Sequence, residues 1–123
     1  MWNTAFAIVI GLLLAFHGFA HWQVTTVWGT RPEASSWLLG RSAQGLGKIL
    51  WVITLLAFLV AAVGAAFQFG WWRPVTVAAT LVSLSTLVLF WNRRMWIGTG
   101  VDIGVLVGML GLGWPPAAVL GGA

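Results

Sequence analysis

Four long apolar runs, separated by shorter polar segments, dominate the sequence. They cover about residues 2–22, 46–69, 75–91 and 97–114. Each run is close to the ~20 residues that a helix needs to cross the hydrocarbon core of a bilayer, the last two being the shortest. The pattern therefore predicts an all-α integral membrane protein. We expect an antiparallel bundle of four transmembrane helices that forms a single domain over residues 1–123.

The segments between the runs have the character of loops and turns. Residues 23–45 form a polar loop, which is long enough for a short interfacial helix near Ser35 and Ser36, either of which could cap it. Residues 70–74 and 92–96 contain the turn-forming residues of tight connections. These short links favour neighbouring helices that run in opposite directions.

The basic residues predict how the bundle is oriented. Only Arg73 lies in the second connection, whereas the opposite end of the expected bundle carries Arg31, Arg41, Lys48, Arg93 and Arg94. An excess of lysine and arginine marks the cytoplasmic side of a membrane protein. We therefore expect a multi-pass protein of the bacterial inner membrane with both termini outside the cytoplasm.

The composition agrees with a membrane protein and excludes several other classes. Hydrophobic residues make up 60% of the chain and charged residues 7%, whereas a soluble domain has about 25% charged residues. The chain has no cysteine, which excludes disulfides and thiolate metal sites. The net charge of +4 comes mainly from the connections, without a basic patch, so we expect no nucleic-acid partner. The expected partners are the lipid bilayer and other membrane subunits, or further copies of this chain.

Small residues recur at helical spacing and predict where helices pack closely. Packing and interhelical hydrogen bonds replace the hydrophobic effect between helices in a bilayer. The expected packing residues are Gly11 in the first run, Ala61 and Ala65 in the second, and Gly100, Gly104 and Gly108 in the fourth. A stripe of hydroxyl groups marks the third run, at Thr76, Thr80, Ser83 and Thr86. Asp102 lies roughly opposite Gly104 on a helix, so the fourth run should contact neighbours on two faces.

The candidate functional residues come together at one depth of the expected bundle. The two histidines, His17 and His21, are four residues apart and share one helix face. His17 and Asp102 each lie about five residues inside the end of a run, so antiparallel helices bring them to similar depth. Thr54 and Thr86 fall near the same level. Ionisable groups at such a depth are costly to bury and are therefore candidate site residues.

Three interpretations of this set are open. His17 and Asp102 could form a polar clasp that fixes the register of the helices, because buried polar groups must be paired whatever their role. They could instead relay protons, because histidine changes its protonation near neutrality.

The third interpretation is cofactor binding. His17 or His21 could ligate a haem or a chlorophyll-type pigment, or hold a quinone, with Asp102, Thr54 and Thr86 in support. The His-x-x-x-His pair with a carboxylate from another helix also has the ligand types of a metal site. Two histidines on one helix face cannot bind opposite sides of one haem, so bis-histidine ligation within a monomer is not expected.

The first run also carries a resemblance. Gly11 is followed about a turn and a half later by His17-Gly18. In this respect the segment from Ile10 to Phe19 resembles the first helix of DoxX-like small four-helix membrane proteins. The resemblance implies a small bacterial four-helix bundle, often an accessory component of a redox or quinone-linked system.

These features together predict a small membrane scaffold or accessory subunit within a larger assembly. Little sequence lies outside the runs to hold a substrate, and no nucleophile elbow, phosphate loop or pair of catalytic carboxylates is present. We therefore expect no enzyme activity. The alternative is a cofactor-, pigment- or quinone-binding membrane protein that uses His17 or His21 with Asp102 in support.

Overall fold

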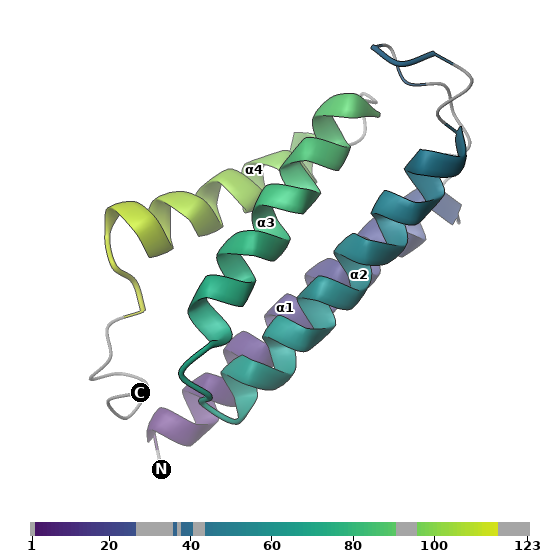
Figure 1. Ribbon diagram of the computed structural model, residues 1–123. Coiled ribbons are helices and arrows are strands. Elements are labelled where there is room, and N and C mark those ends of the chain that lie inside the picture. The colour runs from purple at the N-terminus through teal and green to yellow at the C-terminus, as the bar shows by residue number, and fades with distance from the viewer. Residues whose placement is uncertain (1, 27–35, 37, 41–43, 91–95, 116–123) are drawn as a thin grey trace.

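The protein is all-α in the part that the structure describes. The computed structural model describes residues 2–26, 36, 38–40, 44–90 and 96–115. The elements are α1 (Trp2–Thr26), α2 (Gln44–Ala66), α3 (Trp72–Leu89), α4 (Trp96–Leu106) and the π-helical turn η3 (Val107–Gly111). The helices run alternately in opposite directions, and α4 leans away from the other three (Figure 1). The prediction of a four-helix, all-α chain is confirmed.

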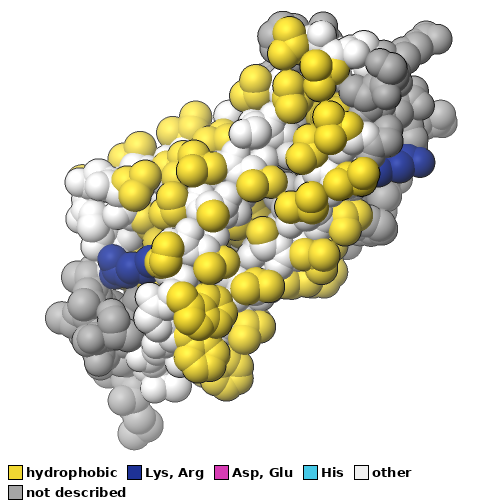
Figure 2. Space-filling model, in the orientation of Figure 1, with side chains coloured by type: hydrophobic (Ala, Val, Ile, Leu, Met, Phe, Trp, Pro, Cys, Tyr) yellow, Lys and Arg dark blue, Asp and Glu magenta, His cyan; other side chains and the backbone are white. Residues whose placement is uncertain are grey.

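Two of the four helices are long and apolar enough to cross a membrane, judged by length and composition. They are Leu46–Ala66 within α2 and Trp72–Leu89, which is α3. The apolar segments of the other two, Thr4–Ala20 and Trp96–Gly111, are shorter. On the face seen in Figure 2, basic side chains lie near the two ends, and the band between them is largely hydrophobic.

The turn between α2 and α3 has the expected length but lies three residues earlier in the chain than the apolar runs suggested. Helix α2 ends at Ala66, three residues before the expected end at residue 69, and α3 begins at Trp72, three residues before the expected start. Gln68 has a φ of 56°, a left-handed conformation that ends the helix. Pro74 falls in the first turn of α3, where its missing N–H breaks no intrahelical hydrogen bond.

The fourth run does not form one regular helix. Helix α4 ends at Leu106 and continues as the wider turn η3, in which Leu112 N donates to Val107 O at 3.0 Å. Trp114 N closes the end by donating to Gly108 O at 2.8 Å. The glycines of this segment favour the change, because glycine is a weak helix former.

The prediction of an interfacial helix near Ser36 is wrong. Leu38 and Leu39 form a turn, in which both N–H groups donate to Ser36 Oγ at 3.2 and 3.1 Å. The Ser36 hydroxyl in turn donates to Leu89 O, at the end of α3, at 2.6 Å. Ser36 therefore caps a turn, as an N-cap serine would cap a helix, and ties the turn to α3.

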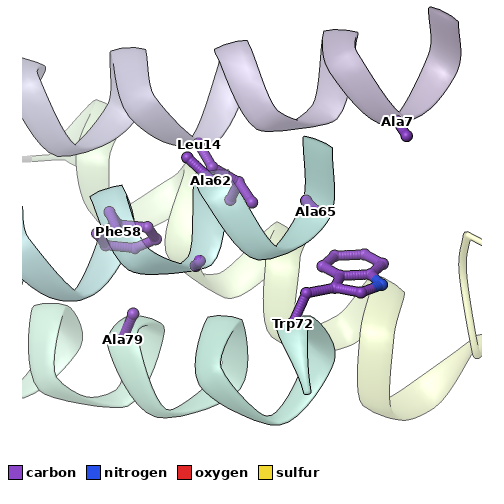
Figure 3. Packing of buried hydrophobic residues seen from close by; sticks show 8 residues of the cluster. Ala7, Leu14, Phe58, Ala62, Ala65, Trp72 and Ala79 are labelled. Atoms are coloured by element: carbon purple, nitrogen blue, oxygen red, sulfur yellow. The ribbon is translucent and has the colours of Figure 1, made fainter. Parts of the chain in front are cut away.

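Helices α1, α2 and α3 pack around a core of small and aromatic side chains (Figure 3). The cluster contains Ala7, Leu14, Phe58, Ala61, Ala62, Ala65, Trp72 and Ala79. Gly11 allows α1 to approach α2, because a Cβ on Gly11 would lie 2.8 Å from Ala62 O. The expected packing residues of the first and second runs therefore lie where these helices meet.

Gly100, Gly104 and Gly108 form the glycine face of α4, which, unlike Gly11, has no close neighbour in the described structure. A Cβ added to any of the three would meet nothing within 4 Å in the described structure. These glycines therefore do not bring α4 close to another described helix.

This difference predicts opposite effects for matched substitutions. Gly11→Ala should lower the free energy of unfolding by about 1–3 kcal/mol, because its Cβ overlaps a backbone carbonyl and forces α1 away from α2. Gly100→Ala should be neutral or slightly stabilising, because alanine is the better helix former and has room. Unfolding in detergent micelles, followed by circular dichroism, measures both. A Gly11→Ala variant as stable as the Gly100→Ala variant would contradict the close α1–α2 contact.

Candidate functional site

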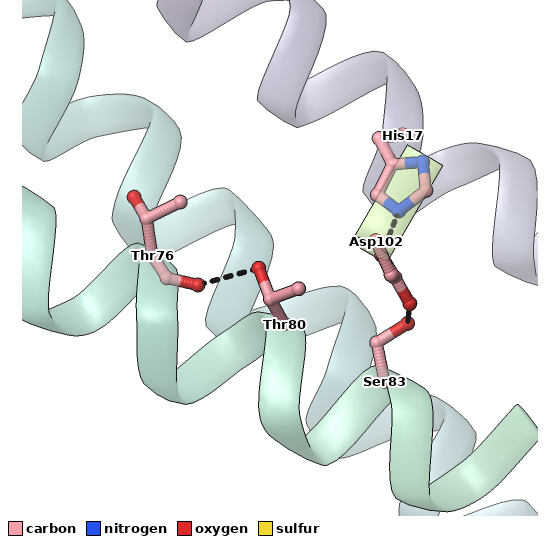
Figure 4. Close-up of polar contacts among 5 residues, drawn as sticks. All are labelled: His17, Thr76, Thr80, Ser83 and Asp102. Carbon is pink, nitrogen blue, oxygen red and sulfur yellow. Dashed lines mark hydrogen bonds and ion pairs between the residues drawn. The ribbon is translucent and has the colours of Figure 1, made fainter. Parts of the chain in front are cut away.

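Three side chains from three helices form a buried polar cluster (Figure 4). His17 comes from α1, Ser83 from α3 and Asp102 from α4. His17 Nε2 is hydrogen-bonded to Asp102 Oδ1 at 2.7 Å, and the Ser83 hydroxyl donates to Asp102 Oδ2. Asp102 and Ser83 are fully buried, and the His17 side chain is 13% exposed. We call this cluster the clasp, because it joins three helices through one carboxyl group.

The position of His17 follows from its neighbours on α1 and α2. Gly18 lies against α2, where a Cβ would come within 2.9 Å of Phe58 Cβ. The Phe58 ring meets the His17 imidazole edge to face, with centroids 4.8 Å apart and an interplanar angle of 89°. The fully buried Phe58 thus supports the imidazole while Nε2 reaches Asp102.

Asp102 has an unusual role in its own helix. It is the one residue of α4 that is buried in the described structure. Most apolar side chains of α4, such as Val101 and Ile103, lie exposed on either side of it. Helix α4 is therefore attached to the bundle at this level through a carboxyl group.

The geometry restricts what His17 can bind. A carboxylate can only accept hydrogen bonds, so Nε2 carries the proton when Asp102 is ionised. A nitrogen that donates a proton to a carboxylate cannot at the same time ligate a haem iron, a pigment magnesium or another metal. Ligation through Nε2 would therefore require the clasp to open.

The other predicted site residues, Thr54, Thr86 and His21, are not part of the clasp as the structure describes it. Thr54 and Thr86 are fully buried, but each hydroxyl donates to a carbonyl of its own helix, Leu50 O and Val82 O respectively, both at 2.8 Å. Neither bond is directed at the His17–Asp102 pair. The side chain of His21 lies outside the described residues, and the metal prediction for His17 with His21 lies there too. The part of the chain that is described contains no group of three metal-ligating side chains.

Ser83 is the site residue that the sequence reasoning did not select. It belonged to the predicted hydroxyl stripe, but the depth argument selected Thr86 instead. Helix α4 leans across α3, so Asp102 meets the stripe about one turn away from the expected level (Figure 1). A straight antiparallel bundle does not predict this shift.

An apolar groove lies between α1 and α4, with a volume of about 300 Å³. We call it the α1–α4 groove. Its walls include Ile10, Leu13 and Leu14 from α1 and Val101, Gly104, Val105 and Gly108 from α4 and η3. The clasp joins α1 to α4 at one level, and an edge-to-face contact between Phe6 and Trp114, with centroids 5.9 Å apart, joins α1 to the segment after η3. These two contacts are separated by roughly 16 Å along α1.

The comparisons with known proteins do not assign this site. No protein-family model, curated protein or solved structure matches the chain. The resemblance to DoxX-like proteins therefore stays a resemblance of the first helix alone.

The clasp predicts a measurable coupling between its members. His17→Ala and Asp102→Ala should each lower the free energy of unfolding by about 1–3 kcal/mol, because each leaves a buried polar partner without its hydrogen bond. In a double-mutant cycle, the pair should show a coupling energy of about 0.5–2 kcal/mol, the range for such bonds between membrane helices.

Two serines supply a matched control for the same unfolding measurement in detergent micelles. Ser83→Ala should destabilise the protein, whereas Ser85→Ala should not, because Ser85 is exposed and its hydroxyl donates to Leu81 O of its own helix. Equal effects of the two serine substitutions, or a coupling energy of zero between His17 and Asp102, would show that the clasp does not hold the helices together.

Proposed function

We propose that the protein is a non-catalytic, multi-pass scaffold subunit of the bacterial inner membrane, which packs against a helix of another membrane subunit through α4. The observation that carries this proposal is the contrast between two sets of glycines. A Cβ on Gly11, Gly18 or Gly64 would approach a neighbouring element within 2.8, 2.9 and 2.5 Å respectively. The glycine face of α4 has the same small-residue character and meets nothing within 4 Å in the described structure.

The spacing of the glycine face fits a second membrane helix. Gly100, Gly104 and Gly108 recur every four residues and line one side of α4 and η3. Small residues at this spacing let the backbones of two helices approach closely in a bilayer. The exposed apolar side chains beside the stripe, Val101 and Val107, suit an apolar partner helix.

The clasp supports a structural role. In a membrane, a buried aspartate and histidine are the residues most suited to chemistry. Here His17 is hydrogen-bonded to Asp102, which also accepts a hydrogen bond from Ser83. Their arrangement holds α4 at its angle to α3. The glycine face lies beside this contact without a close neighbour, and Gly104 and Gly108 form part of the wall of the α1–α4 groove.

Site-specific cross-linking in native membranes tests the proposed partner. A photoreactive residue at Gly104 should form an adduct with a different membrane protein, because the partner helix is expected to lie against this face. The same residue at Val60, an exposed position of α2, is the matched control and should not form that adduct. Gly100→Leu should weaken the Gly104 adduct by about tenfold, because a bulky side chain separates the helices. An adduct with a second copy of this chain, or no protein adduct, would contradict the proposal.

A second candidate function is the binding of a cofactor, pigment or quinone in the α1–α4 groove. The observation that favours it is the position of this apolar groove close to the clasp, which could offer its polar groups to one end of a ligand. A quinone carbonyl would need the Nε2 proton of His17, and a haem or pigment metal would need its Nε2 lone pair, so either ligand requires Nε2 to be released from Asp102. The cross-linking experiment separates the two functions, because this candidate predicts a small-molecule adduct at Gly104 that His17→Ala abolishes.

The proposed orientation can be tested independently, because the chain has no native cysteine. Gly70 and Leu39 are both exposed and lie in connections at opposite ends of α2. From the distribution of basic residues, we expect a membrane-impermeant thiol reagent added to intact cells to label Gly70→Cys and not Leu39→Cys. Labelling of Leu39→Cys alone would show that the protein sits the other way up.

A further inference from the structure

Arg73 carries a positive charge whose hydrogen-bonding groups are largely unused. The residue lies in the first turn of α3, and its Cζ is 5.5 Å from the centroid of the Trp72 ring. Its Nε and Nη2 atoms are buried, and neither has a hydrogen-bond partner in the described structure. The great majority of buried polar groups in proteins are hydrogen-bonded. A guanidinium with two such donors therefore calls for an acceptor.

Among the residues that the structure describes, no carboxylate is available to pair with Arg73. It contains two carboxylate residues, of which Asp102 belongs to the clasp. Glu33 belongs to the connection between α1 and α2, outside the described residues. Arg73 lies in the first turn of α3, at the positive end of the helix dipole, and this turn contains no acidic residue. The guanidinium and the helix end both favour an anion that comes from outside the chain.

A second apolar groove begins at Arg73. This groove, which we call the α3–η3 groove, has a volume of about 390 Å³. On α3 it runs past Val77 and Leu81, which follow Arg73 at intervals of four residues on the same helix face. On the other side it is lined by Met109 and Leu110 of η3. Arg73 is therefore the one charged residue of an otherwise apolar groove.

The direction of the groove matches that of a membrane lipid. Arg73 lies at the end of α3, next to the α2–α3 turn, and the groove extends from it toward the middle of the helix. The path from Arg73 to Leu81 covers about 12 Å. A lipid places its phosphate at the membrane surface and its acyl chains toward the bilayer centre, which is the same order of charged and apolar parts.

We infer that the α3–η3 groove binds an anionic phospholipid, with the headgroup phosphate on the Arg73 guanidinium and one acyl chain along Val77 and Leu81. The inference rests on the proposed membrane placement and is independent of the proposed partner on α4. Arginine suits this role, because its planar fork can hold two phosphate oxygens at once. The contact with the Trp72 ring holds the guanidinium near the mouth of the groove.

Lipid titration of the delipidated, full-length protein tests the site. Native mass spectrometry would compare phosphatidylglycerol with phosphatidylcholine of the same acyl chains. Arg73→Gln should weaken phosphatidylglycerol binding by about tenfold, since a charged hydrogen bond to the phosphate is lost, and should weaken phosphatidylcholine binding less, because the choline cation offsets the phosphate charge. Lys48→Gln, which removes the same charge at the other end of α2, is the matched control and should leave both affinities unchanged. Equal losses in the two variants, or no loss in Arg73→Gln, would overturn the inference.

A second pair of measurements separates the headgroup from the acyl chain. Ala78 is exposed on the wall of the groove, so Ala78→Trp should fill it and weaken phosphatidylglycerol binding with Arg73 in place. Inorganic phosphate at millimolar concentration should not displace the lipid. If phosphate alone binds as tightly as phosphatidylglycerol, or if Ala78→Trp has no effect, the groove does not hold an acyl chain.

The membrane placement has its own readout. Alkaline extraction of membranes should leave the protein in the pellet if it spans the bilayer. Release into the supernatant would refute the placement on which the inference rests. A protein that resists extraction while its Arg73→Gln variant still binds phosphatidylglycerol like the wild type would refute only the lipid site.

Discussion

The buried carboxyl group of Asp102 is the contact on which the position of α4 depends. Every other residue that the structure describes in α4 is at least partly exposed, so apolar burial contributes little to its attachment. A buried carboxylate is stable only when its oxygens are hydrogen-bonded, and Asp102 meets this condition through His17 and Ser83. These two hydrogen bonds fix Asp102, and with it this level of α4, relative to α1 and α3.

The glycines of the helices fall into two groups, those with a close neighbour and those without one. Gly11 and Gly18 let α1 lie directly on the backbone and side chains of α2. Gly64 does the same for the α2–α3 turn, where the Trp71 ring covers it. Helices that approach this closely gain van der Waals contact, which remains available as a stabilising interaction where water is absent. The glycine face of α4 has the same composition and lacks a described neighbour, which is why we assign it to another chain.

The sequence was sufficient to predict the helices and the central pair of the clasp. Apolar runs of nearly constant length determine how many helices form, and antiparallel connection then brings His17 and Asp102 to one depth. The sequence was not sufficient to identify Ser83, because the lean of α4 shifts its contact with α3 by about one turn. It also could not identify the role of Arg73, since an unpaired guanidinium is recognised only when its surroundings are known. Both failures concern angles and distances between helices, which apolar periodicity does not contain.

The order of helix contacts has a consequence for how the chain assembles. Helix α1 packs on α2, α2 on α3 and α3 on α4, so each new helix docks mainly on the one made just before it. The clasp is an exception, because His17 and Asp102 are 85 residues apart in the chain, and the Phe6–Trp114 contact is another. During synthesis, His17 and Ser83 can therefore contact Asp102 only after α4 has been made. A chain truncated before α4 would leave His17 and Ser83 without that partner.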